Sequence, residues 1–171
     1  DTVADPIFAT YVERLWAEIM PAVVPPDGAD LPAYADALLS RFANTAIQHQ
    51  TWQIAMDGSQ KLPQRLLQTM QQNINEGRDV GALCLGVAAW MRYASGVDET
   101  GQPIDVRDPL AARFAAIATA AITPEQTAHG FLSLEDIFSK DIAAQLKTPV
   151  TQAANRLWAV GARGAIKELL E

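Results

Sequence analysis

A pair of basic side chains stands at a predicted helix start, where it could bind an anion. Lys61 and Arg65 are four residues apart, and Ser59 is positioned to cap the helix that carries them. A cation in the first turn opposes the helix dipole, and two like charges on one face repel each other. The free amide groups of a helix start add positive potential. One interpretation is therefore that an anionic or polyhydroxy ligand offsets these three unfavourable effects.

The alternative interpretation of this turn needs no ligand. Lys61 and Arg65 then point into water, and each unfavourable contact costs roughly a few tenths of a kcal/mol. Asp57 is predicted to be structural, because its carboxylate can hold the corner before the helix through bonds to nearby amides. His49 is predicted to be a packing or surface residue and not a catalyst.

Several kinds of catalytic motif are missing from the sequence. No two glycines are spaced as Gly-x-Gly, which excludes a dinucleotide fingerprint and a P-loop in these residues. There is no Gly-x-Ser-x-Gly elbow. Cys84, His49 and His129 are too few to form a zinc-type ligand cluster. The acidic pair at 135–136 is predicted to lie on a solvated helix face, where no catalytic role is needed.

Length and composition predict one globular domain over residues 1–171. The chain is 49% hydrophobic and 19% charged, the balance of a folded protein. Its net charge of −7 argues against binding to nucleic acid or to anionic membranes. No stretch reaches the roughly 20 apolar residues of a membrane span, and the first residues lack signal-peptide features. The lone cysteine, Cys84, is predicted to be a small buried hydrophobe and fits a reducing compartment, so a cytoplasmic location is expected.

Helix signals recur along the whole chain and predict an all-α fold. Capping residues or prolines precede runs in which apolar residues recur every three or four positions. Glycine and proline mark the turns between these runs. Helices are expected from Asp5-Pro6 to Met20, from Asp30 through Phe42, from Asn44 toward Asp57, from Ser59 to Gly77, over about 80–93, from Asp108-Pro109 through Ile117, from Thr123-Pro124, and over the segments 133–147 and 150–170, the last interrupted by Gly161 and Gly164.

Two stretches of the sequence resemble a known family, in that family's order. The first is Arg41-Phe-Ala-Asn44 followed by the run from Trp52 to Arg65. The second is Met91-Arg92-Tyr93, followed by Gly96-Val-Asp-Glu99, Gly101 and Asp108-Pro-Leu110. Together they resemble the mannitol dehydrogenase family of long-chain, NAD-dependent polyol and sugar-acid dehydrogenases. The first stretch is most similar to the fructuronate reductase (D-mannonate oxidoreductase) branch.

The resemblance implies a domain arrangement. A multi-helix C-terminal domain, similar to that of 6-phosphogluconate dehydrogenase, covers the substrate, and an N-terminal Rossmann-type domain binds NAD. The family's proton-transferring lysine lies in a Lys-x4-Asn-x2-His motif. No asparagine follows Lys61, Lys140 or Lys147 at that spacing. The catalytic lysine and the cofactor site are therefore expected outside this chain, which alone is expected to be inactive.

The resemblance also implies roles for individual residues. Lys61 matches the family lysine that hydrogen-bonds substrate hydroxyls. Gln53 stands where mannitol-specific members place a substrate-contacting arginine. Together with Arg65, one turn beyond Lys61, this favours an acid substrate whose carboxylate accepts charge-assisted hydrogen bonds. Lys61, Arg65 and Gln53 are the predicted substrate-binding residues, and Asp57 and Ser59 are the predicted structural residues of the turn.

The sequence thus predicts the C-terminal substrate-binding part of an NAD-dependent oxidoreductase. The expected reaction interconverts D-mannonate and D-fructuronate, or a related polyol or sugar acid. No catalytic, cofactor-binding or metal-binding residue is expected within the chain. An apolar face that would pack on the N-terminal domain is expected to mediate self-association or to lie beside the turn at 58–65. The alternative is a free-standing helical binding or scaffold domain without catalysis.

Overall fold

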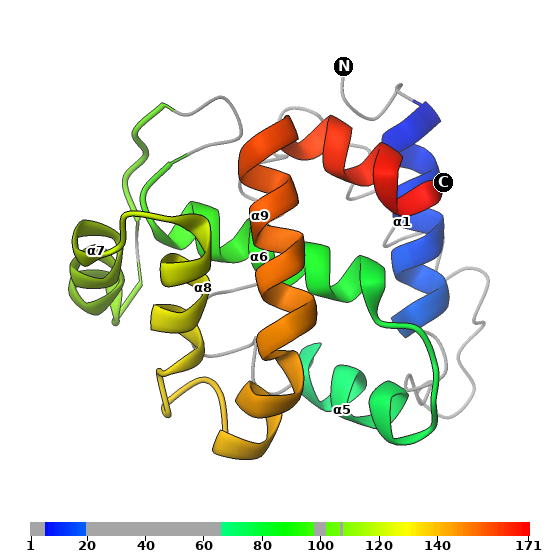
Figure 1. Ribbon diagram of the computed structural model, residues 1–171, viewed down its shortest axis with the longest axis horizontal. Helices are drawn as coiled ribbons and strands as arrows, with labels where there is room; N and C mark the ends of the chain where they lie inside the picture. Colours follow the sequence, from blue (N-terminus) through cyan, green and yellow to red (C-terminus); the bar gives the residue numbers. More distant parts are fainter. Residues whose placement is uncertain (1–5, 20–65, 98–101, 107) are drawn as a thin grey trace, which may run out of the picture.

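The computed structural model describes residues 6–19, 66–97, 102–106 and 108–171, which fold mainly as helices (Figure 1). Within these ranges the pairing of extended backbone is limited to one isolated antiparallel bridge, between Val97 and Pro103. The all-α prediction is confirmed for this part of the chain. The helices predicted from Asp30 and from Asn44 lie outside it. The described helices are α1 (Pro6–Ile19), α5 (Gln68–Asn75), α6 (Gly81–Ala94), α7 (Ala111–Ala120), α8 (Pro124–Leu132) and α9 (Lys140–Leu170).

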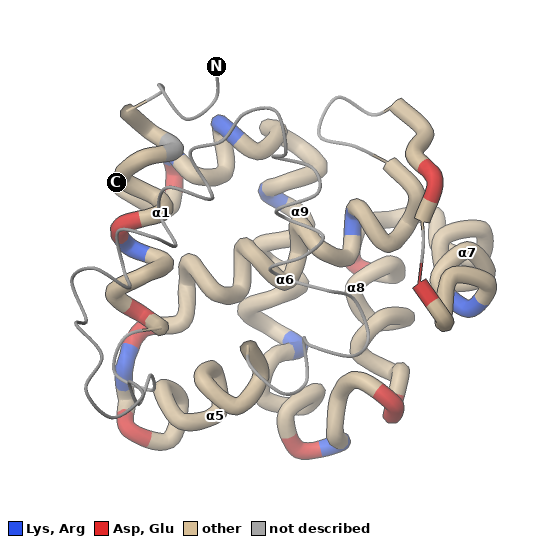
Figure 2. The backbone as a smooth tube through the Cα atoms, turned by 180° about the vertical axis from the view of Figure 1, so that it is seen from behind, with Lys and Arg blue, Asp and Glu red and all other residues tan. Residues whose placement is uncertain are grey.

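Helix α6 forms the centre of the described core. Its sequence carries a single charge, Arg92, and Figure 2 shows it crossing the middle of the molecule while most charged residues lie on outer helices and turns. Ten of its residues are buried: Ala82, Leu83, Cys84, Leu85, Gly86, Val87, Ala88, Trp90, Met91 and Ala94. Such a helix needs neighbours on several sides. It packs against α1, α7, α8 and α9.

An aromatic cluster joins α6 to the helices at one end of the molecule. The ring of Trp90 lies 5.6 Å from that of Phe114 on α7 and 5.4 Å from that of Phe131 on α8. The Trp90 ring also lies 6.3 Å from that of Phe138, just before α9. The first two pairs are edge-to-face, an arrangement that adds stabilisation beyond the area that the rings bury. The cluster therefore holds α7 and α8 against the central helix.

Helix α9 corrects one prediction. Separate helical segments were expected over 133–147 and 150–170. The helix instead begins at Lys140 and continues through Pro149. The buried residues Leu146 and Val150 flank the proline at helical spacing on the face that packs against α6 and α8. This packing on both sides of the proline outweighs the hydrogen bond that it removes.

The corner in α9 lies at Gly161, as the sequence predicted. Gly161 has φ 73° and ψ 174°, a backbone conformation that is essentially restricted to glycine. Gly164, the other predicted interruption, lies within the helix. After the corner the last turns run back toward α1, so that the C-terminal end lies beside the first helix (Figure 1). Arg156 and Glu168 form an ion pair across the corner, with Nε and Oε2 2.7 Å apart.

Candidate functional site

The substrate-binding residues predicted from the sequence lie outside the described part of the chain. This applies to Gln53, Lys61 and Arg65, and also to the turn residues Asp57 and Ser59 and to His49. Their roles stay predictions. These residues belong to the segment 20–65, and the structure describes what flanks it: α1 ends at Ile19 before the segment, and the described chain resumes at Leu66 after it.

The described residues of the second stretch that resembles the family make contacts that hold the fold together. Arg92 stacks over the ring of Trp158, with its guanidinium carbon 5.4 Å from the ring centre. Gly96 has φ +85°, and its carbonyl accepts a hydrogen bond of 2.9 Å from the backbone N–H of Ile104. The Asp108 carboxylate accepts from the N–H of Leu110 at 2.8 Å. These residues fix the α6–α9 contact and the loop that leads to α7.

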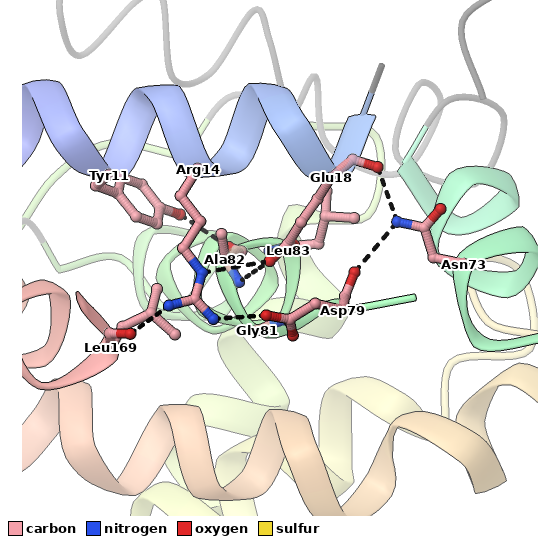
Figure 3. Close-up of polar contacts among 9 residues, drawn as sticks. All are labelled: Tyr11, Arg14, Glu18, Asn73, Asp79, Gly81, Ala82, Leu83 and Leu169. Atoms are coloured by element: carbon pink, nitrogen blue, oxygen red, sulfur yellow. Dashed lines mark hydrogen bonds and ion pairs between the residues drawn. The ribbon is translucent and has the colours of Figure 1, made fainter. Parts of the chain in front are cut away.

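The most extensive polar network among the described residues surrounds the start of α6 (Figure 3). Val80, at the N-cap position, provides no side-chain cap. Glu18, on α1, supplies one instead: its carboxylate accepts from the backbone N–H of Ala82 at 2.9 Å and of Leu83 at 2.8 Å. Asp79 accepts from the N–H of Gly81 at 3.0 Å. Two acidic groups thus satisfy free donors at the positive end of the helix dipole.

Arg14 connects this helix start to the end of α9. Its Nη2 lies 2.7 Å from a carboxylate oxygen of Asp79, and its Nη1 donates to the backbone carbonyl of Leu169. A cation is favourable at a helix C-terminus, where carbonyl groups lack partners. One turn before it on α1, the Tyr11 hydroxyl donates to the carbonyl of Ala82 at 2.9 Å. Tyr11, Arg14 and Glu18 therefore lie on one face of α1 and dock it onto α6 and α9.

Asn73 extends the network to α5. Its side chain has no exposed surface, and its Nδ2 donates to the carbonyl of Glu18 at 2.8 Å and of Asp79 at 3.2 Å. Its Oδ1 accepts from Nε of Arg78 at 3.1 Å. The Asn73 carbonyl also accepts from the backbone N–H of Arg78 at 2.7 Å. Asn73 therefore joins the last turn of α1, the end of α5 and the turn that leads into α6.

Burial and hydrogen bonding shift the pKa values of the acidic groups in opposite directions. Burial raises the pKa of Glu18 above its ordinary value, and the amides of Ala82 and Leu83 only partly oppose this effect. Asp79 has a lowered pKa, mainly because its carboxylate accepts from the N–H of Gly81 and also because it bonds to Arg14. Burial likewise raises the pKa of the Tyr11 hydroxyl above its usual range.

The network stabilises the fold. The contacts of Glu18, Arg14 and Asn73 drawn in Figure 3 are made to other groups of the chain and join α1 to α5, α6 and α9. Across the described ranges, no group of three or more His, Cys, Asp or Glu side chains could hold a metal ion. In the same ranges, no helix is long and apolar enough to cross a membrane.

Sequence reasoning did not predict this network. Arg14 and Glu18 are charged residues on an amphipathic helix, a pattern typical of a solvated face. Their partners lie far along the chain, since Ala82 is 64 residues after Glu18 and Leu169 is 155 residues after Arg14. The one available signal was Val80 at the N-cap position, whose side chain cannot accept from the free amides that follow.

The chain is similar to known oxidoreductases over almost its full length. It is 43% identical to the D-mannonate oxidoreductase of Escherichia coli (strain K12), over 99% of this chain and 35% of that protein. It is 31% identical to a mannitol dehydrogenase of Saccharomyces cerevisiae, over 100% of this chain and 34% of that protein. The chain thus spans about a third of the length of these relatives.

A solved structure and a family pattern agree with these similarities. The fold matches the Pseudomonas fluorescens mannitol 2-dehydrogenase, solved as a ternary complex with NAD and D-mannitol. The TM-score is 0.78 at 28% identity, over 99% of this chain and 34% of that one. The pattern of the mannitol dehydrogenase C-terminal domain matches residues 1–158. The resemblance predicted from the sequence is therefore confirmed: the chain belongs to the mannitol dehydrogenase family and corresponds to the C-terminal domain of its oxidoreductases.

Proposed function

We propose that this chain is the substrate-binding part of an NAD-dependent oxidoreductase that interconverts D-mannonate and D-fructuronate, or a closely related sugar acid. The observation that carries the proposal is the 43% identity to a D-mannonate oxidoreductase along 99% of the chain. The mannitol 2-dehydrogenase with the same fold, which binds NAD and D-mannitol, supports the wider class of reaction and the cofactor.

Three residues of the segment 20–65 are assigned to the substrate. Lys61 donates hydrogen bonds to its hydroxyl groups, and Arg65 pairs with its carboxylate. A planar guanidinium can hold a carboxylate through two parallel hydrogen bonds. Gln53 replaces the arginine that mannitol-specific members place at this position, and it can accept as well as donate. Asp57 and Ser59 are assigned to the turn between Gln53 and Lys61. These residues bind and orient the substrate, which is the contribution of positioning to catalysis.

Proton transfer and hydride transfer are assigned to the remainder of a longer protein. The chain has no Gly-x-Gly spacing and no lysine followed by asparagine and histidine at the family spacing. NAD, when bound, supplies the hydride acceptor or donor. An N-terminal Rossmann-type domain would carry the cofactor and the catalytic lysine, and the chain alone is expected to be inactive. Localisation in the cytoplasm is part of this proposal.

Activity measurements on the full-length protein test the choice of substrate. D-Mannonate and D-mannitol are compared at equal concentration with NAD, and the wild type is expected to prefer the acid. Arg65→Ala should weaken this preference by lowering kcat/KM for D-mannonate while changing that for D-mannitol little. Arg163→Ala, an arginine far along the chain, is the control. Equal use of both substrates by the wild type, or an equal loss on both substrates for Arg65→Ala, contradicts the assignment.

A further inference from the structure

The last turns of α9 follow a sharp corner and form a separate stretch, which we call the strap (residues 162–170). The corner is Gly161, and the strap runs back along α1 (Figure 1). The side chains of Ala165 and Ile166 in the strap are buried, with exposed fractions of 4% and 3%. One backbone position therefore joins the strap to the rest of α9, and a residue at the boundary of an element can absorb a large change in φ and ψ.

The strap, α1 and the start of α6 meet at Gly81. A Cβ atom added there would lie 3.0 Å from Cδ1 of Leu169, on the strap, and 3.2 Å from Nη2 of Arg14, on α1. Arg14 joins the same three elements through hydrogen bonds, since it donates to the carbonyl of Leu169 and to the carboxylate of Asp79, just before α6 (Figure 3). The strap and α1 thus share one anchor at the start of α6.

An exposed ion pair holds the corner closed from the other side. The guanidinium of Arg156, before Gly161, binds the carboxylate of Glu168, on the strap, with Nε and Oε2 2.7 Å apart. Because both side chains are exposed, this pair contributes little free energy and is screened by salt. The strap is therefore held mainly by its buried side chains and by Arg14.

We propose that the strap and α1 open as one local unit. When the backbone rotates at Gly161 and the strap leaves, Arg14 loses the carbonyl of Leu169, and α1 separates from the start of α6. Helix α8 and the first half of α9 stay folded, because the buried residues Leu146 and Val150 hold that half against α6 and α8. The inference goes beyond the proposed function and does not depend on it.

Hydrogen exchange of the full 171-residue chain tests this coupling with a matched pair of substitutions. Ile166→Ala removes packing atoms from the strap, and Ile142→Ala removes the same atoms from the first half of α9, where Ile142 is 5% exposed. A helix of 14 residues is only marginally stable in water without its partners, so a released α1 exchanges its amide protons.

Ile166→Ala should therefore speed exchange in α1 and in the strap about tenfold or more, and leave α8 and residues 140–157 unchanged. Ile142→Ala should leave exchange in α1 unchanged, because the unit opens without unfolding the core. Where alanine prevents folding, Ile166→Val and Ile142→Val repeat the comparison with a smaller expected change, roughly twofold to tenfold. A wild-type rate in α1 for the Ile166 variant overturns the proposal. An acceleration of all helices alike, or the same acceleration of α1 by both variants, overturns it too.

The thiol of Cys84 gives a second readout on the same variants. It is 2% exposed on α6, and Tyr11 and Glu18 of α1 interact electrostatically with it. Release of α1 should therefore make the thiol accessible. Ile166→Ala should raise the rate at which a thiol reagent labels the folded chain at pH 8 about tenfold, whereas Ile142→Ala should not change it. Equal labelling rates for the two variants contradict the release of α1 from α6.

Discussion

Glu18 on α1 caps the central helix α6 at Ala82, with a carboxylate oxygen 2.9 Å from the backbone nitrogen. Val80, the N-cap residue of α6, makes no side-chain cap, and Asp79 accepts from the N–H of Gly81. The first helix supplies the acceptor for the next two amides, those of Ala82 and Leu83. A second contact of α1 links the two ends of the described chain, because Arg14, one turn before Glu18, donates to the carbonyl of Leu169 near the end of α9.

Removal of this cap should destabilise the fold. Glu18→Ala leaves two amide groups at the start of α6 without their acceptor, which should lower the free energy of unfolding by about 1–3 kcal/mol. Glu13→Ala, on an exposed position of the same helix, should change it by less than about 0.5 kcal/mol. Chemical denaturation monitored by circular dichroism measures both values. Similar values for the two variants would mean that the cap contributes nothing.

The two acidic groups at the start of α6 should give opposite pH dependence. The folded-state pKa of Glu18 is raised above its ordinary 4.5, so the stability it contributes is present at lower pH and is lost as pH rises through the folded pKa. The pKa of Asp79 is lowered from 3.8, so its contribution is present above that value and is lost as pH falls.

The destabilisation caused by Glu18→Gln should therefore shrink as pH rises above 4.5, and that caused by Asp79→Asn should shrink as pH falls below 3.8. Urea unfolding at several pH values gives both differences from the wild type. If both substitutions show the same sign of pH dependence, the amides of Ala82 and Leu83 outweigh burial in setting the pKa of Glu18, which contradicts the prediction.

Gly161 should tolerate substitution less well than Gly77. Both have positive φ, but Gly161 combines φ 73° with ψ 174°, where a side chain is strained even though no atom lies within 4 Å of an added Cβ. Gly161→Ala should lower the free energy of unfolding by about 1–3 kcal/mol, more than Gly77→Ala at the end of α5. Thermal denaturation ranks the two. A larger loss for Gly77→Ala would contradict the assignment of strain to the corner in α9.

Cys84 should react slowly with thiol reagents in the folded chain. It is 2% exposed, and burial raises its pKa to about 12, so that the reactive thiolate is scarce at pH 8. Labelling should become fast when the chain is unfolded in urea. Rapid labelling of the folded chain at pH 8 would contradict its burial in α6.

The sequence predicted the parts of the fold that depend on local chemistry. Apolar residues four apart from Ile7 to Ile19 predicted α1. Gly77 was predicted to end a helix and Gly161 to interrupt one, and φ is positive at both. The Thr123 capping box before Pro124 likewise marks the start of α8. The start of α9 at Lys140 and its continuation through Pro149 were not predicted, because they depend on packing against neighbouring helices.

Long-range contacts could not be predicted in the same way. Nothing near Glu18 or Arg14 in the sequence indicates a partner 64 or 155 residues away. The candidate substrate site was predicted from the resemblance and from the unusual placement of two cations. The family is confirmed, and the roles of Lys61, Arg65 and Gln53 stay predictions, because these residues lie outside the described ranges.

The kinetics of Lys61→Ala in the full-length protein test the central claim most directly. A lost charge-assisted hydrogen bond is worth about 1.5–3 kcal/mol, so kcat/KM for D-mannonate should fall roughly tenfold to over a hundredfold. NADH binding and the melting temperature should stay near those of the wild type, and Lys147→Ala, an exposed lysine on α9, should leave kcat/KM unchanged. A folded Lys61→Ala protein with the kcat/KM of the wild type would contradict the assignment of this segment to the substrate.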